Sequence, residues 1–308
     1  MKNKDIIKSK KREQRIYRLL VSVLIFLIFI LFTVFVPMLV NTIIGIREKD
    51  RLNNNISRIK EKYGIDIFYE GNMSEEMECK YKLSDDMEAN SKAVSDISVI
   101  LDRITLDLVR ELINYGKGEE YVKGNINIFL CNAMEENIYG QTEFLEDGFS
   151  IYIKICDNSV KAIFSHEIFH RIIGYIIVNS WINYDKENSY MKWKSVLPEG
   201  YEYMEDREDY DGESISNKKL QYTYGVENDI SNVYFLNSYS QKNQDEDMCD
   251  IFAYLLAINE DGELPKAFDS PHVKEKAKLI VDMIAETFDC VDENAYWAKI
   301  YREKIANN

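Results

Sequence analysis

The stretch "FSHEIFHRIIG", residues 164–174, contains two of the three histidines in this chain of 308 residues. His166 and His170 are four positions apart, and Glu167 directly follows the first of them. The neighbouring apolar residues recur at helical spacing on most sides, which predicts a buried helix. Residues at i and i+4 lie on one face of a helix, one turn apart, so the two imidazoles can reach a common point. The pattern therefore predicts a buried helix with a pair of histidines on one face.

Paired imidazoles at this spacing are a frequent zinc-binding arrangement. Glu167 is displaced by about 100° around the helix from His166, so we expect its carboxylate at the rim of the site, beside a metal-bound water. Zinc lowers the pKa of such a water to about 7, and a carboxylate can take its proton as it attacks a peptide carbonyl. The HExxH pattern therefore predicts one zinc ion per chain, with Glu167 as the general base of peptide hydrolysis.

A third zinc ligand has to come from elsewhere, and two acidic segments compete for this role. Residues 193–204, "WKSVLPEGYEYM", offer Glu199. Residues 237–256 offer Glu246 and Asp250, which are four positions apart on a predicted helix. There Glu246 can bind the metal, while Asp250 accepts a hydrogen bond from a ligand histidine. The residue types alone leave both segments open.

The order of these motifs resembles a known family of enzymes. HEIFH is followed by a helix of the pattern E-x-x-x-D/E-x-F-A, and a tyrosine lies seven residues before the first acid. This arrangement resembles the catalytic domain of the anthrax-lethal-factor-type gluzincins. It is also similar to the secreted Pro-Pro endopeptidases and to the zinc metallopeptidases proposed for bacterial surfaces. The resemblance covers about 160–256 and implies that Glu246 is the third ligand, that Asp250 is the second acid, and that the phenol of Tyr239 stabilises the oxyanion.

Residues 193–203 also resemble a segment that runs from a tryptophan to a tyrosine between the two motifs of some surface metallopeptidases. The position of Glu199 is not a metal position there, so the resemblance favours Glu246. The chain departs from the family in its 75 residues between His170 and Glu246, more than compact members use. Cys249 and Asp250 stand where alanine and glutamate are more usual, and the aspartate is one methylene shorter.

Residues 19–46 contain no charged side chain. At 1.5 Å per residue this segment exceeds a bilayer core of roughly 30 Å. It is longer than the apolar part of a signal peptide and has no small-residue cleavage site, which indicates an uncleaved anchor. Eight lysines and arginines precede it, so the positive-inside rule predicts a cytoplasmic tail (1–18), a juxtamembrane stalk (47–63) and an extracytoplasmic peptidase domain (64–308). We thus expect a single-pass type II protein of the cell membrane.

Charge and cysteine content argue against a nucleic-acid-binding protein and against a domain held together by disulfides or by cysteine-bound zinc. The formal net charge is −15, and the chain beyond the membrane segment lacks the clustered cations that nucleic-acid binding needs, so we expect no nucleic acid among its partners. The five cysteines contain no C-x-x-C pair. This spacing predicts neither a disulfide framework nor a cysteine-based zinc site.

Predicted strands precede predicted helices in the domain, without βαβ alternation, which is an α+β pattern. The predicted strands are 65–71, 124–131 and 148–156, and the predicted helices are 84–114, the HEIFH helix, 244–259, one beginning at residue 270, and 292–306. We expect a gluzincin-like domain with a small mixed sheet over the HEIFH helix and a mainly helical C-terminal half. By analogy with the family, 148–155 is expected to pair with an extended peptide by β-augmentation.

The sequence therefore predicts a membrane-anchored zinc endopeptidase. Its partners are a polypeptide substrate and, through residues 19–46, the lipid bilayer. The alternative is a catalytically inactive, peptidase-derived binding or scaffold domain at the cell surface. The intact HExxH motif argues against this alternative, because Glu167 has little use without hydrolysis.

Overall fold

A computed structural model describes residues 2–73, 79–114, 124–145, 148–155, 160–182, 188–206, 221–259 and 261–307. The chain forms two compact units, Met1–Asn53 and Asn54–Asn308. The second unit begins inside the segment predicted as a stalk, and Ile56, Ile59 and Tyr63 of that segment are buried.

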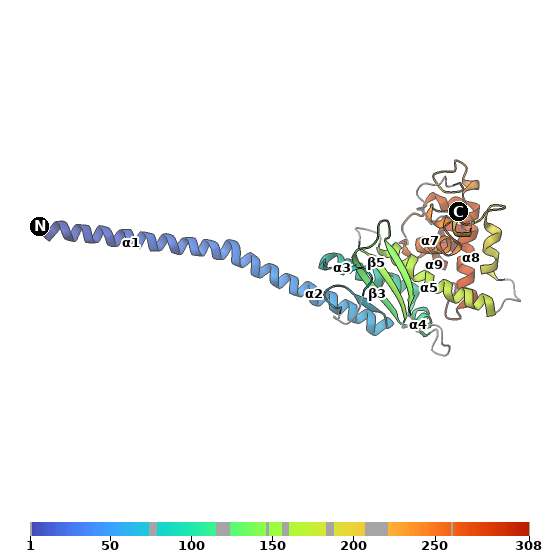
Figure 1. The fold of residues 1–308 in the computed structure, drawn as a ribbon, viewed down its shortest axis with the longest axis horizontal. Helices are drawn as coiled ribbons and strands as arrows, with labels where there is room; N and C mark the ends of the chain where they lie inside the picture. Colours follow the sequence, from blue (N-terminus) through green and yellow to red (C-terminus); the bar gives the residue numbers. More distant parts are fainter. Residues whose placement is uncertain are drawn as a thin grey trace. The chain divides into compact units, whose positions relative to one another are not determined.

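The N-terminal unit is helical (Figure 1). Helix α1 (Lys2–Ile30) continues through a π-helical turn (Leu31–Phe35) into α2 (Val36–Tyr63). The widened turn ends two residues before Pro37, which has no N–H and whose ring would clash with the carbonyl four residues earlier in a regular α-helix. The apolar part has a mean hydropathy of 3.3 and none of it is buried, so this helix is long and apolar enough to cross a membrane by length and composition.

The second unit contains a small mixed sheet, as the sequence predicted, and the described residues form five strands in it, where three were predicted. Its strands are β1 (Asp66–Phe68), β2 (Lys82–Leu83), β3 (Ile126–Ala133), β4 (Gly140–Leu145) and β5 (Gly148–Lys154). The strand order is β1-β3-β5-β4, and β2 pairs with β3. Strand β5 runs parallel to β3 and antiparallel to β4.

Strand β5 is an interior strand, so the expectation that 148–155 offers an open edge to a peptide is wrong. Ile151 pairs with Ile128 of β3 on one side and with Thr142 of β4 on the other. The buried run of β5 is typical of a strand flanked on both sides. Strand β4 was not predicted, because its polar residues obscure the alternation that marks a strand. Among the described residues no strand pairs with its outer edge.

The segment predicted as a single helix over 84–114 is two helices, so that prediction is wrong. Helix α3 (Met87–Ile104) begins at the N-cap Asp86, whose side chain accepts a hydrogen bond from the Ala89 N–H. It ends at Thr105, which has a φ of 78°, and α4 (Leu106–Asn114) follows. Each helix buries one apolar face, and the helical spacing of apolar residues continues across Thr105. The sequence pattern therefore does not reveal the break.

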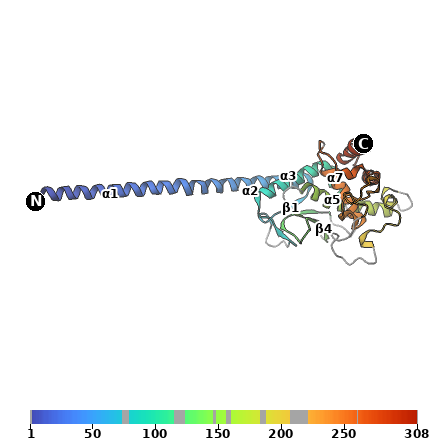
Figure 2. The same ribbon diagram turned by 90° about the horizontal axis from the view of Figure 1, so that it is seen from above.

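The HEIFH helix, α5 (Val160–Ile182), packs against α3, α7 and α8 and against strands β4 and β5 (Figures 1 and 2). The helical C-terminal half contains α7 (Gln244–Ala257), α8 (Pro271–Thr287) and α9 (Tyr296–Tyr301), the last extended by a π-helical turn (Arg302–Ala306). The helices predicted near 244–259 and from residue 270 are confirmed. Shorter helical pieces are α6 (Ser189–Lys192), η2 (Trp193–Val196), η3 (Met204–Asp206), η5 (Ile230–Asn232), η6 (Tyr239–Gln241) and η7 (Lys266–Asp269).

Candidate metal centre

Helices α5 and α7 are fixed face to face by buried aromatic residues. The rings of Phe169 and Phe252 are stacked, with centroids 4.1 Å apart, and both side chains are fully buried. Phe169 lies on the turn between the two histidines, and Phe252 follows Asp250 on α7. This packing sets the distance between the histidines and the acids of α7, which the sequence could not provide.

Three potential ligand atoms meet between these helices. Nε2 of His166 lies 2.9 Å from Oε2 of Glu246, and Nε2 of His170 lies 3.5 Å from the same oxygen. The three side chains are only 8–18 % exposed. Ligand atoms of a tetrahedral zinc ion with bonds of 2.0–2.2 Å are about 3.3 Å apart. The spacing and chemistry of this donor set therefore fit a zinc ion.

The other nitrogen of His166 is held by Asp250. Nδ1 lies 3.1 Å from Oδ1 of Asp250. The second carboxylate oxygen of Asp250 accepts hydrogen bonds from Asn237 Nδ2 at 2.9 Å and from Ser240 Oγ at 2.7 Å. A hydrogen bond donated by Nδ1–H to this carboxylate orients the ring and leaves Nε2 as the nitrogen that could bind a metal ion. The sequence singled out neither Asn237 nor Ser240, and only their position ahead of α7 hinted at a role.

Tyr239 and Lys242 hold the far oxygen of Glu246. The phenol of Tyr239 donates to Oε1 at 2.8 Å, and Nζ of Lys242 donates to the same atom at 3.1 Å. Burial and the charge of Glu246 raise the pKa of Tyr239, so the phenol keeps its proton. Burial alone would lower the pKa of Lys242, but the carboxylates of Glu246 and Glu205 raise it. Sequence reasoning missed Lys242, although its i, i+4 spacing to Glu246 was a usable signal.

The negative charge of the Glu246 carboxylate is stabilised by a positive charge next to Oε2. Burial would raise the pKa of Glu246, but hydrogen bonds from His166 and His170 lower it, so the carboxylate is ionised. Burial would lower the pKa of His166, yet its bonds to Asp250 and Glu246 raise it to about 10. In this geometry a proton on Nε2 occupies the position that a metal ion could take. A metal ion and a proton therefore compete for the same position between Nε2 of His166, Nε2 of His170 and Oε2 of Glu246.

Glu167 lies to one side of this centre, against strand β4. A Cβ atom added at Gly140 would lie 2.4 Å from Oε1 of Glu167 and 2.7 Å from Cγ2 of Ile163. Glycine therefore leaves the space in which the carboxylate sits. Burial raises the pKa of Glu167 to about 7, although both neighbouring imidazoles favour its charged form. The side chain is 6 % exposed, so it is more enclosed than the rim position that helix geometry suggested.

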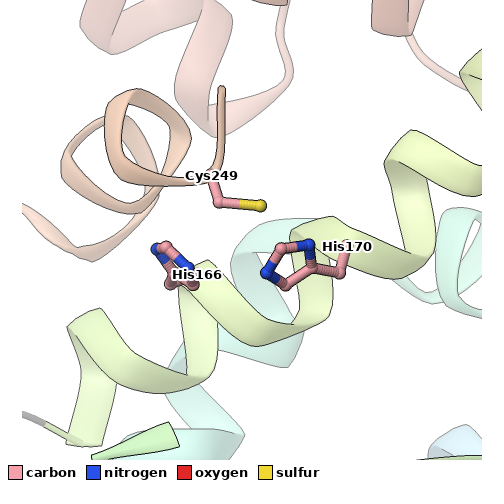
Figure 3. Close-up of side chains that lie close together, drawn as sticks. All are labelled: His166, His170 and Cys249. Carbon is pink, nitrogen blue, oxygen red and sulfur yellow. The ribbon is translucent and has the colours of Figure 1, made fainter. Parts of the chain in front are cut away.

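Cys249 is a site residue that the sequence treated as a minor departure. Its thiol and the ligand nitrogens of His166 and His170 all lie within 4.8 Å of one another, and Figure 3 shows the sulfur turned toward the two rings. Cys249 is fully buried, and burial raises the pKa of its thiol well above the usual value. It lies three residues after Glu246, hence on the same side of α7. The site therefore offers two candidates for a third ligand, the oxygen of Glu246, 2.9 Å from His166, and the thiol of Cys249.

Glu199 lies elsewhere. It is exposed and lines a surface pocket with neighbours between Lys194 and Asp206, a set that includes none of the histidines. The surrounding segment has a structural function instead. Nε1 of Trp193 donates to the hydroxyl of Tyr203 at 2.9 Å, and that hydroxyl donates to Oδ2 of Asp247 at 2.8 Å. The tryptophan and the tyrosine of this segment thus support α7 next to Glu246.

Comparisons with known proteins give little further information. No family model matches the sequence, and no curated protein matches it. Among solved structures, a proposed zinc-binding metallo-peptidase from Bacteroides caccae is similar at 13 % identity and a TM-score of 0.45. The alignment covers 85 % of this chain and 95 % of the other.

Proposed function

We propose that this chain is a membrane-anchored, zinc-dependent endopeptidase of the gluzincin type. The observation that carries the proposal is the meeting of three atoms from distant parts of the chain. Nε2 of His166 and Nε2 of His170 lie 2.9 Å and 3.5 Å from one oxygen of Glu246. Two imidazoles and a carboxylate are the protein ligands of many catalytic zinc sites, in which a fourth position stays open for water or substrate.

His166, His170 and Glu246 would hold the zinc ion. When bound, zinc polarises the peptide carbonyl and makes the attacking water more acidic. Glu167 accepts the proton of that water and later delivers it to the leaving amine. The close approach of its carboxylate to Gly140 restricts its orientation. Asp250 keeps the proton of His166 on Nδ1, and Asn237 and Ser240 keep Asp250 in place.

Tyr239 supplies the donor for the oxyanion that develops on the peptide carbonyl. Its phenol donates to Glu246 over 2.8 Å, so it already lies at the site. The side chain is 43 % exposed, so a substrate can approach it from solvent. A donor that engages the oxygen mainly in the transition state raises the rate more than it raises substrate affinity.

The polypeptide substrate binds as an extended strand along the outer edge of β4. Gly140 opens this strand and adjoins Glu167, so a peptide paired with β4 would pass beside the general base. Main-chain hydrogen bonds to an open sheet edge tolerate many side chains. This proposal replaces the expectation that β5 binds the substrate.

Residues 19–46 anchor the enzyme in the cell membrane, with the N-terminus in the cytoplasm and the catalytic domain outside. Two features support this arrangement. The apolar helix is long enough to span a bilayer core of roughly 30 Å, and eight cationic residues precede it in the sequence.

The test is the metal content and peptidase activity of the full chain purified in detergent. We expect about one zinc ion per wild-type chain by elemental mass spectrometry, and loss of most of it in Glu246→Ala. Glu199→Ala is the matched control and should keep its zinc. Glu167→Gln should also keep zinc but lose cleavage of a peptide library. Equal zinc loss in Glu199→Ala and Glu246→Ala would contradict the assignment of Glu246.

A second candidate function is an inactive scaffold with a structural metal, and Cys249 is the observation that favours it. A thiol beside both histidines could act as a further ligand and close the position that catalysis needs open. Such a protein would bind zinc, cleave no peptide in the library, and show no change in any cellular phenotype on Glu167→Gln.

A further inference from the structure

The sheet has a second hydrophobic cluster that is separate from the metal site. Along β3, Phe129 and Cys131 alternate with Ile128 and Leu130, so the first two side chains lie on the other face of the sheet. The buried residues of this cluster are Leu83, Phe129, Cys131 and Tyr152. Partly buried residues that pack against it are Phe68, Met73, Cys79, Tyr81 and Met134.

Two cysteines meet inside this cluster. The side chain of Cys79 packs against the buried cluster that contains Cys131, and the two thiols interact with each other there. Strand β2 pairs with β3 so that Leu83 is the register partner of Cys131, and Cys79, in the segment before β2, packs against the same cluster. The Cys131 thiol also lies 3.5 Å from the carbonyl oxygen of Phe129. Both thiols are free in the structure.

We propose that Cys79 and Cys131 form a disulfide when the domain meets an oxidant of the disulfide class, such as a small-molecule disulfide or a disulfide-carrying oxidoreductase. This inference does not depend on the metal site. In the first step the Cys79 thiol loses its proton, and the thiolate attacks the oxidant and releases one thiolate from it. The Cys131 thiol then loses its proton, and this second thiolate attacks the sulfur of Cys79 and releases the second. Two cysteine thiols are oxidised, one external disulfide is reduced, and the two protons pass to solvent or to the released thiolates.

The environment of the two sulfurs decides the order of these steps. Cys79 is partly exposed, whereas Cys131 is fully buried, so an external oxidant can reach only Cys79. Burial raises the pKa of Cys131 to about 12 and also raises that of Cys79. Few thiolates are therefore present at neutral pH, and we expect the bond to form slowly without a catalyst.

The bond would close a loop of 51 residues between Cys79 and Cys131. This loop contains β2, α3 and α4, and α3 packs against α5, which carries the histidines. Cross-linking a loop of this length restricts the unfolded chain and so stabilises the fold. We expect reduction of the bond to lower the thermal midpoint by on the order of 5 °C.

The experiment uses the full chain in detergent, equilibrated with oxidised glutathione and then quenched with N-ethylmaleimide. Peptide mass spectrometry should find Cys79 joined to Cys131, with both residues absent from the maleimide-labelled peptides. A phosphine reductant, which adds no competing thiol, should reverse the bond and lower the thermal midpoint.

Single variants provide controls at each sulfur. In the Cys79→Ser variant, Cys131 should stay a free thiol, and the thermal midpoint of the variant should not change when the reductant is added. Cys131→Ala should trap a stable glutathione adduct on Cys79. Cys290→Ser is the matched control, because this partly exposed cysteine lies beyond α8, and it should leave the Cys79–Cys131 bond intact. Maleimide labelling of both cysteines after equilibration, or a persistent glutathione adduct on Cys79 of the wild type, would overturn the proposal.

Discussion

Oδ1 of Asp250 lies 3.1 Å from Nδ1 of His166, while the other nitrogen of that ring lies 2.9 Å from Glu246. One imidazole is therefore held between two carboxylates of a single helix, one turn apart. The first carboxylate fixes the orientation of the ring, and the second shares with it the position that a metal ion can occupy. This relationship makes α7 as important to the site as the HEIFH helix.

Asp250→Asn should weaken zinc binding about 10–100-fold without unfolding the protein, because a neutral amide oxygen is a weaker acceptor for the Nδ1 proton than a carboxylate, and the amide NH2 cannot accept the hydrogen bonds of Asn237 and Ser240. Competition with a chromophoric chelator measures this affinity. Asp282→Asn on α8 is the control, since Asp282 is half-exposed and ion-paired only with Lys278 among the described contacts. Unchanged affinity in Asp250→Asn would mean that Asp250 does not orient a ligand.

Cys249→Ala tests which residue is the third ligand. If Glu246 binds the metal, the cobalt-substituted full chain should show no thiolate-to-cobalt charge-transfer band, and Cys249→Ala should keep its metal. Near-ultraviolet absorption of the two cobalt proteins decides the matter. A band in the wild type that disappears in Cys249→Ala would establish sulfur coordination and favour the scaffold function.

Gly140→Ala should reduce kcat by on the order of 10–100-fold while the zinc content stays the same. The added methyl would lie 2.4 Å from Oε1 of Glu167, so the carboxylate has to move away from its working position. Gly174→Ala on α5 is the matched control, because its added Cβ meets nothing within 4 Å. That variant should retain full activity and gain up to about 1 kcal/mol of stability from its helical position. Equal activity of the two variants would refute the proposed placement of Glu167.

Lys276→Met should lower the free energy of unfolding by about 3–5 kcal/mol. Lys276 and Asp247 are both fully buried, and their charged groups lie 2.5 Å apart. Removing the cation leaves a buried carboxylate whose other oxygen already has no hydrogen-bond partner. Urea unfolding monitored by tryptophan fluorescence measures this free energy. The control Lys278→Met, at a half-exposed position, should change the free energy of unfolding by less than about 1 kcal/mol. A similar small effect in both variants would show that the buried pair contributes little to stability.

The position of His166 and His170 on one helix face could be predicted because their relationship is local. Four residues on a helix always amount to about one turn, so HEIFH places His166 and His170 on one face in any fold that keeps the helix. The spacing of Glu246 and Asp250, one helical turn apart, could be predicted for the same reason. The unbroken apolar run of residues 19–46 similarly predicts a helix of membrane-spanning length before any packing is considered.

Other features depend on which segments meet in three dimensions, and sequence patterns do not record this. A buried apolar strand has the same pattern whether one or both of its edges are paired, so the interior position of β5 came only from the tertiary structure, as did the outer edge of β4, with which no strand pairs among the described residues. The break at Thr105 was hidden because the two helices it separates bury the same apolar spacing. The position of Cys249 beside the histidines, the space at Gly140 for Glu167, and the contact between Cys79 and Cys131 are set by packing between distant segments. The sequence by itself determined the helices and the spacing of side chains along them, since these follow from local geometry, whereas the tertiary structure decided which atoms face one another, since that depends on long-range packing.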